Sequence, residues 1–479
     1  MSLRRLWAFL AVALPTLGAL VASLQSVDLA YQLRAGADIL DTRAIPLVDT
    51  WTFTAAGLPW TDQQWGAQVI LAVVYRLGDW TGLVLLRAAL VAIIFGCLFA
   101  IGRLQGLGTR RAALLALAAF AVSAVALALR PQLLGMALFA IALLLVVDRR
   151  RHPARLWAIP ILVLVWANVH GSFFLGPLVL GLAWLEDLHD RVERPHQALL
   201  VAVVSIAAAC VTPFGPAVWA YAVGLSTNPQ VTQRITEWQT TSLFELSGAL
   251  FYGSALLVAM LLARRGRAAP WPTLLWFAAF FAIGAYTARG VAWWSIAAVV
   301  VVAAALSPVP SPRPGDIAPP PEPAGTRSMR RLNLVLAAVI VLAGVAVLPA
   351  WRPSDPGLAA PQGVLASAPS GITAALRGVV RPGDRLLNPQ PWGSWFEFAV
   401  PDAPVAIDSR IELFPVAVWD GFDLVEAGGA GWDRQLAGWG VTIAVVRSAD
   451  TGLAARLARA GWTPAYSDVD GSVLLAPGR

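Results

Sequence analysis

A polar stretch from Val27 to Gln68 carries five aspartates in the first half of an otherwise very apolar chain. Two of them, Asp28 and Asp49, are candidate catalytic carboxylates. A carboxylate within hydrogen-bond reach of an attacking hydroxyl acts as a general base, because it takes the proton as the oxygen attacks. The stretch therefore suggests transfer of a group to a hydroxyl, with Asp28 as the first candidate base and Asp49 as the second.

Three arginines offer the complementary charge. Arg130, Arg234 and Arg289 lie in connections or at the ends of hydrophobic segments. A guanidinium fork matches the geometry of a phosphate, and a cation stabilises the charge that grows on a departing phosphate in the transition state. These arginines are therefore candidate partners of a donor phosphate.

Seven further residues are candidates for substrate binding, because they carry polar or aromatic groups near the same connections or in the C-terminal part. They are Tyr31, Gln32, Trp65, His170, Glu237, Asp408 and Arg410. Cys97 and Cys210 lie inside apolar runs, where neither a disulfide framework nor a metal cluster is plausible. No metal ligands are assigned, and a requirement for a divalent metal ion stays open.

The composition shows where these groups would act. Of 479 residues, 58% are hydrophobic and 13% are charged, whereas soluble domains have roughly 25% charged residues. The mean hydropathy is +0.67, so the chain is predicted to be an integral membrane protein. Every basic residue behind the net charge of +7 is arginine, and we do not expect nucleic-acid binding.

Hydrophobic segments long enough to cross a bilayer, about 20 residues each, occur about eleven times. They lie near 6–24, 81–102, 112–129, 131–147, 156–169, 172–185, 197–211, 246–263, 270–286, 291–306 and 332–350. The first is interpreted as a retained anchor, because no good signal-peptidase site follows it. Arg87, inside the second segment, is expected to snorkel to the membrane surface.

Arginine asymmetry predicts the orientation. With the N-terminus in the cytoplasm, the inner loops hold most of the loop arginines, as the positive-inside rule requires. An odd number of spans then places residues 351–479 outside the cytoplasm, on a protein of the inner or plasma membrane. The candidate residues before 307 also fall on the outer side, where they are expected to surround one cavity.

The polar stretch is predicted to form an interfacial helix, a turn and a hairpin. In a helix from Asp28 to Leu40, Asp28, Tyr31 and Gln32 share one face. Residues 51–60 alternate around a glycine, which is typical of a short hairpin. Thr61 and Asp62 are candidate N-caps of a helix that returns to the membrane.

The rest of the chain divides at a proline-rich segment. Residues 1–306 form a transmembrane module with a large first outer loop at 25–80. Residues 307–331 are interpreted as a disordered cytoplasmic linker, followed by a last span at 332–350. Residues 351–479 alternate predicted strands, including 394–400 and 404–408, with predicted helices, which favours a small α/β domain.

Structural roles compete with several site assignments. Asp28 would cap the helix that starts there, and Arg130 would anchor to lipid headgroups. His170 would be a buried, hydrogen-bonded turn residue. Asp408 and Arg410 would form a structural salt bridge at the end of a predicted strand.

The order of motifs resembles a known superfamily. The segments "DLAYQLRAGADIL", "LRPQLLG", "WANVHGSFFLG", "NPQPWGSWFEF" and "PVAIDSRIELF" follow one another as in bacterial multi-span proteins that are similar to the C-type (GT-C) glycosyltransferases. These membrane enzymes depend on polyprenyl-phosphate sugars and are related to protein O-mannosyltransferases. The resemblance implies an α-helical polytopic membrane protein with a GT-C-like fold and a small extracytoplasmic α/β domain.

The resemblance also implies an activity. The chain would transfer a sugar from a polyprenyl-phosphate-linked donor to a glycan, lipid or protein of the cell envelope, at the outer face of the bilayer. Two alternatives stay open. A transporter or flippase would also use outer-facing charges, although no inverted repeat is evident, and a non-enzymatic assembly scaffold would leave Asp28 and Asp49 dispensable.

Overall fold

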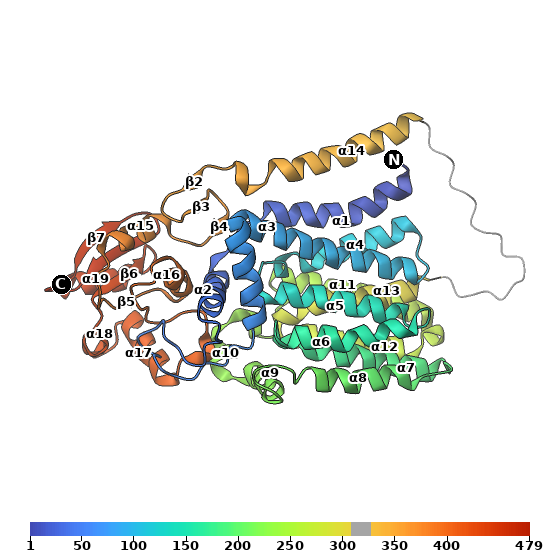
Figure 1. Ribbon diagram of the computed structural model, residues 1–479, viewed down its shortest axis with the longest axis horizontal. Helices are drawn as coiled ribbons and strands as arrows, with labels where there is room; N and C mark the ends of the chain where they lie inside the picture. The colour runs from blue at the N-terminus through green and yellow to red at the C-terminus, as the bar shows by residue number, and fades with distance from the viewer. Residues whose placement is uncertain (308–326) are drawn as a thin grey trace, which may run out of the picture. The chain divides into compact units, whose positions relative to one another are not determined.

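The computed structural model describes residues 1–307 and 327–479, and it divides into two units (Figure 1). The first unit comprises Met1–Ala22, Val84–Val223 and Ile235–Leu348, and the second comprises Ser23–Leu83, Gly224–Arg234 and Pro349–Arg479. The first loop and the C-terminal part, which most of the chain separates, therefore belong to one folding unit.

Apolar helices that run side by side form the first unit (Figure 1). They are α1 (Leu3–Val21), α4 (Thr109–Ser123), α5 (Pro131–Asp148), α6 (Ile159–Ala167), α7 (Leu175–His189), α8 (His196–Ala208), α11 (Leu246–Arg265), α12 (Trp271–Tyr286), α13 (Val291–Leu306) and α14 (Arg327–Ala346). α3 (Trp65–Leu104) belongs to both units and is interrupted at Asp79, where φ is 52°. Each predicted hydrophobic segment coincides with one of these helices.

Within the described residues, eight helices are long and apolar enough to cross a membrane. α6, α8, α12 and α9 (Ala217–Thr227) are apolar but shorter, and α9 was not among the predicted spans. The chain is a multi-pass membrane protein. α13 is largely buried because α4, α5, α11 and α12 pack around it, whereas α14 packs mainly on α1 and exposes most of its surface.

The second unit is a small α/β structure around a four-stranded sheet. Its strand order is β5 (Leu386–Leu387), β6 (Ile443–Arg447), β8 (Gly471–Leu475) and β7 (Thr463–Ser467); β5 and β6 are parallel and the other pairs antiparallel. Its helices are α2 (Ser26–Thr42), α10 (Pro229–Arg234), α15 (Ser370–Val379), α16 (Gln390–Ala399), α17 (Val416–Ala427), α18 (Trp432–Trp439) and α19 (Thr451–Arg459).

Short strands join the first loop to the C-terminal part of the second unit. β1 (Leu24–Gln25), at the start of the first loop, pairs in parallel with β4 (Leu365–Ala366) of the C-terminal part. β2 (Ser354–Asp355) pairs with β3 (Ala360–Pro361) within the C-terminal part. α2 packs against α16. The predicted helix at 28–40 is present as α2, which extends two residues further at each end, and Gln32 on its polar face is buried.

Two predicted strands of the C-terminal domain are wrong. Residues 394–400 lie mostly in α16, because Trp392, Trp395 and Phe396 recur at the spacing of one helical face and are all buried. Residues 404–408 form no regular strand and contribute only isolated bridges, of Val405 to Leu386 and to Thr52. The alternation of strands and helices that favoured an α/β domain is confirmed by the mixed sheet.

The predicted hairpin and helix start in the first loop also need correction. Residues 51–60 form turns, and the antiparallel pairing there is a single bridge between Val48 and Pro59. α3 begins at Trp65, so neither Thr61 nor Asp62 caps it. Instead, the Asp62 carboxylate accepts a hydrogen bond of 2.6 Å from Gln68 Nε2, one turn inside the helix.

The predicted linker at 307–331 lies mostly outside the described residues. α14 begins at Arg327, a few residues before the predicted span at 332–350.

Candidate functional site

The first unit gathers two of the candidate arginines around one acid. Arg130 caps the N-terminus of α5, Arg289 lies in the short helix η6 (Ala288–Gly290) before α13, and Glu237 lies in η4 (Thr236–Trp238). Arg130 Nη1 is 2.6 Å from Glu237 Oε1, and Arg289 Nη2 is 3.3 Å from Glu237 Oε2. Two guanidinium groups on one carboxylate leave the cluster with a net charge of +1.

Neighbouring residues hold Arg289 in place. Its guanidinium lies 5.0 Å from the ring centroid of Trp238, and its backbone carbonyl accepts a 3.5 Å hydrogen bond from Gln132 Nε2. A Cβ on Gly290 would lie 2.0 Å from the Ile283 carbonyl oxygen. Glycine is therefore needed for the turn that carries Arg289 to approach α12 closely.

The arginine cluster has the electrostatics of an anion site. The side chains of Arg130 and Arg289 are 21% and 22% exposed, so both remain accessible. Each lies at a helix N-terminus, where the backbone adds partial positive charge. Burial would raise the pKa of Glu237, but Arg289 and Arg130 outweigh burial and lower it, so Glu237 is a charged carboxylate that orders both arginines.

His170 is a buried turn residue in the same unit. It caps the short helix η3 (Gly171–Phe174), and its Nδ1 lies 2.7 Å from Ser172 Oγ and accepts a 3.2 Å hydrogen bond from Ser172 N. Its ring centroid is 6.1 Å from that of Trp293. Burial and then the charge of Arg289 lower the pKa of His170 to about 3, so the imidazole is neutral.

Asp28 lies in the second unit, on the first turn of α2. The helix begins at Ser26, so Asp28 is not its N-cap, and its side chain is half-buried. One turn later, Gln32 Nε2 donates to Tyr31 Oη at 2.6 Å and to Gln64 Oε1 at 2.8 Å. The polar candidates Tyr31 and Gln32 are thus tied to the segment before Trp65, the first residue of α3.

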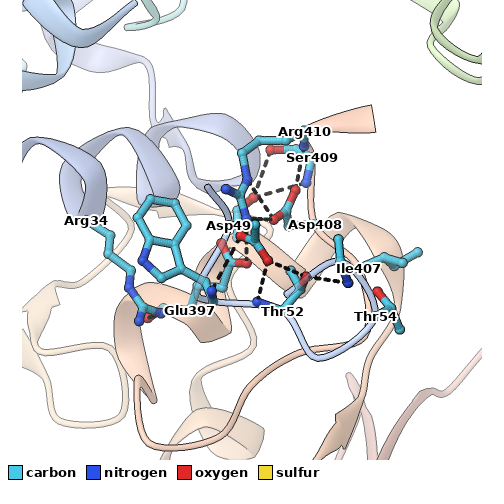
Figure 2. A network of polar contacts seen from close by, with 12 residues as sticks. Arg34, Asp49, Thr52, Thr54, Glu397, Ile407, Asp408, Ser409 and Arg410 are labelled. Carbon is cyan, nitrogen blue, oxygen red and sulfur yellow. Dashed lines mark hydrogen bonds and ion pairs between the residues drawn. The ribbon is translucent and has the colours of Figure 1, made fainter. Parts of the chain in front are cut away.

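Asp49 is the centre of a buried turn (Figure 2). Its Oδ2 accepts hydrogen bonds from Thr52 N at 3.1 Å and from Thr52 Oγ1 at 2.6 Å, and its Oδ1 accepts from Trp51 N at 3.4 Å. Arg410 Nη2 donates to Oδ1 at 2.7 Å. The side chain of Asp49 is 0% exposed, so its contacts have the character of a structural site.

Arg410 connects three carboxyl groups (Figure 2). Besides Asp49, it pairs with Asp408 Oδ2 at 2.5 Å and lies 3.5 Å from Glu397 Oε1. Its guanidinium also lies 4.5 Å and 4.6 Å from the ring centroids of Trp51 and Trp60. Burial opposes its charge, but the surrounding carboxyl groups, Asp408 first, outweigh burial and raise the pKa of Arg410. The salt bridge expected between Asp408 and Arg410 is present.

Glu397 is a buried acid of this network. Burial, followed by the negative charge of Asp408, raises the pKa of Glu397 well above its usual range. Arg34 donates to the Glu397 backbone carbonyl at 2.7 Å.

Asp62 makes stability depend on pH. Burial raises its pKa to about 7 from the unperturbed 3.8, despite the hydrogen bond from Gln68. Because the folded state binds this proton more tightly, its stabilising contribution is full below about pH 4 and is lost as pH rises towards 7. Asp62→Asn, which stays neutral, is expected to raise the melting temperature at pH 7.5 and flatten its slope between about pH 5 and 7.5.

The measurement is thermal unfolding of the detergent-solubilised protein at several pH values. Asp384→Asn is the control, because hydrogen bonding from Arg479 lowers the pKa of Asp384 to about 2. Stabilisation by Asp384 is present above about pH 4 and is lost only at lower pH. An unchanged slope in Asp62→Asn would show that Asp62 is already charged when folded.

Two further arginines differ from expectation. Arg234 does not join Arg130 in the first unit; it lies in the second, where its guanidinium donates to both carboxylate oxygens of Asp423 at 2.6 and 3.2 Å and stacks on Trp419. Arg87, expected to snorkel, is 2% exposed, and its Nη2 donates to the Ala22 carbonyl at the end of α1.

No group of three or more His, Cys, Asp or Glu side chains that could hold a metal ion occurs among residues 1–307 and 327–479. Sequence reasoning missed Glu397, Arg34 and Asp62. For Glu397 a signal existed, because an acid between two phenylalanines of an apolar run has to be paired or protonated.

Comparison with known proteins supports the fold. No protein-family model and no curated protein matches the chain. The archaeal oligosaccharyltransferase AglB from Archaeoglobus fulgidus, in complex with an inhibitory peptide and a dolichol-phosphate, aligns with a TM-score of 0.58 at 12% identity, covering 92% of this chain and 69% of AglB. Its apo form gives 0.59 with the same identity and coverage.

A second similar structure is ArnT from Cupriavidus metallidurans bound to undecaprenyl phosphate. It aligns over 97% of both chains at 16% identity, with a TM-score of 0.45. The likeness to AglB shows a shared fold, and the predicted GT-C-like fold is confirmed.

Proposed function

We propose that this chain is a membrane glycosyltransferase that moves a sugar from a polyprenyl-phosphate-linked donor to a hydroxyl group of a cell-envelope acceptor. The single observation that carries the proposal is the Arg130–Glu237–Arg289 cluster, in a chain with the fold of an oligosaccharyltransferase. A partly exposed pair of arginines with one balancing acid suits a phosphodiester, which carries one negative charge.

The reaction needs two functions from the protein. The acceptor oxygen attacks the anomeric carbon, and the bond between that carbon and the phosphate oxygen breaks. The polyprenyl phosphate leaves with the bonding electron pair, and the acceptor proton passes to a carboxylate. We assign the proton to Asp28, which is half-buried, rather than to Asp49, which is buried and paired with Arg410.

Arg130 and Arg289 would bind the donor phosphate and stabilise it as it leaves. Arg234 is a weaker candidate, because Asp423 already neutralises it. Substituting one arginine still leaves Glu237 paired with the other, so the fold should tolerate either change. This gives the cluster a clean experimental test.

Arg130→Gln and Arg289→Gln are each expected to lower kcat/KM for the lipid-linked donor by about 10²-fold, because each removes a charged donor to the developing phosphate. The measurement is transfer from a synthetic polyprenyl-phosphate sugar by protein in nanodiscs. The matched control is Arg155→Gln, which removes an arginine paired to Asp148 in the same unit. Near-wild-type kcat/KM in both cluster variants would rule out this phosphate site.

The orientation is part of the proposal. A lipid-linked sugar is the available donor outside the cytoplasm, so we place the N-terminus inside and the C-terminal domain outside, as arginine asymmetry favours. Alkaline phosphatase fused after Gly478 should then be active, and fused after Arg267 inactive. The opposite pattern would place the reaction on the cytoplasmic side and contradict the proposed donor.

A further inference from the structure

Two neighbouring residues of the C-terminal part, Ser409 and Arg410, contact the first loop at two places that are 22 positions apart in the sequence. Ser409 Oγ donates to the Val27 carbonyl at 3.2 Å, and Arg410 Nη2 donates to Asp49 Oδ1 at 2.7 Å. Val27 directly precedes Asp28. One short segment therefore contacts the loop both beside Asp28 and at Asp49.

Ser409 is itself fixed by α16. Its backbone N–H donates to Ser394 Oγ at 3.2 Å, and the two hydroxyl oxygens lie 2.8 Å apart. A Cβ on Gly393 would lie 1.9 Å from the Ile407 carbonyl oxygen. Glycine there lets α16 approach the 407–409 segment closely, so the hydroxyl that meets Val27 has a defined position.

Two other contacts join the start of α2 to the C-terminal part. Leu24 and Gln25 pair in parallel with Leu365 and Ala366, and Ser26 Oγ donates to the Ala366 carbonyl at 2.9 Å. The residues before Asp28 are thus fixed by backbone and side-chain hydrogen bonds to the C-terminal part.

The turn around Asp49 is also held by contacts with the C-terminal part. Arg410 is buried between Trp51, Trp60 and its carboxyl partners, and Thr54 Oγ1 donates to the Ala406 carbonyl at 2.5 Å. Thr52 bridges to Val405. Residues 405–410 therefore contact the turn around Asp49 at several positions (Figure 2).

We propose that the Asp408–Arg410 segment is a clasp that positions Asp28, with Ser409 as the positioning residue for the general base. This inference rests on the proposed function, because it assigns the C-terminal domain to the catalytic loop rather than to a separate binding task. A misplacement of about 1 Å at a reacting group costs roughly 10²-fold in rate, so loss of the Ser409 contact should affect turnover.

The first test compares Ser409→Ala with Ser409→Thr, which keeps the hydroxyl. Ser409→Ala should lower kcat by about 10- to 100-fold with the donor KM within about twofold of wild type, and Ser409→Thr should restore kcat. Ser467→Ala is the matched control, because Ser467 also lies 2.8 Å from a serine hydroxyl, that of Ser472, but in the sheet. Hydrogen exchange of residues 26–33 should quicken in Ser409→Ala alone.

The second test links the start of α2 to the C-terminal part at a different place, the β1–β4 pair. Gln25 and Ala366 are paired residues of neighbouring strands, about 4.8 Å apart, within the Cα separation that a disulfide spans. In a Cys97→Ala/Cys210→Ala background, the Gln25→Cys/Ala366→Cys pair should form a disulfide. In this background, the disulfide should raise the kcat of Ser409→Ala towards the kcat of the same protein with Ser409 unchanged.

The outcomes separate this inference from the proposed function. Unchanged exchange at residues 26–33 in Ser409→Ala overturns the clasp whatever the protein catalyses. Quicker exchange with unchanged kcat also overturns it, because the clasp then positions nothing that the reaction needs. A wild-type protein that transfers no sugar refutes the proposed function, while exchange still decides whether the clasp holds α2.

Discussion

Asp28→Asn is expected to lower the rate of sugar transfer by about 10² to 10⁴-fold, because it removes a general base while keeping the size of the side chain. The melting temperature should stay close to that of wild type, since Asp28 lies in the first turn of α2 and does not cap it. Transfer from a polyprenyl-phosphate sugar and thermal unfolding are measured on the same preparation.

The matched control is Asp41→Asn, on the same helix, where an exposed carboxylate pairs with Arg76. It should leave both quantities unchanged. Asp49→Asn is expected to lower the melting temperature, because it weakens the buried partner of Arg410. A helix-stabilising role for Asp28 predicts the reverse pattern, with Asp28→Asn fully active and only Asp28→Ala less stable.

Arg410→Met is expected to destabilise the protein by about 3 to 5 kcal/mol, since it leaves the buried carboxylates of Asp49 and Asp408 without their counter-charge. Methionine fills much of the space of the arginine stem, so the loss reflects charge more than volume. Urea or thermal unfolding in detergent, followed by a probe on the C-terminal domain, measures it.

The network itself supplies the control for this prediction. Adding Asp49→Asn and Asp408→Asn to Arg410→Met removes the stranded charges, and the triple variant should recover a large part of the lost stability. Arg447→Met, which breaks an exposed pair with Asp450, should cost at most about 1 kcal/mol. Wild-type unfolding of Arg410→Met would show that solvent reaches the network.

The membrane helices were predictable because their signal is local. A run of about 20 apolar residues has to be helical in lipid, where every backbone group needs an internal partner. The wrong predictions concerned short segments. α16 contains "SWFEF", which reads as a strand if only its aromatic and apolar content is considered, whereas Trp392, Trp395 and Phe396 follow the helical period.

The candidate site was predictable in residue type but not in pairing. Arg130, Glu237 and Arg289 were each identified from charge at the end of a span, yet only the fold brings them together. Asp49 and Arg410 are separated by 361 positions, and nothing local indicates that one neutralises the other. Their burial also favours a structural role for Asp49, which the sequence analysis had kept as the second candidate for the general base.

The central claim is most directly tested by one measurement on the wild-type protein. Nanodiscs that contain the protein are incubated with a polyprenyl-phosphate donor, radiolabelled in its sugar, and with a cell-envelope extract. The proposed function predicts label in the envelope fraction and release of one polyprenyl phosphate for each sugar transferred. A donor that stays intact in this assay would contradict the proposed function. This holds also if the intact donor is found to cross the bilayer in a parallel liposome sample.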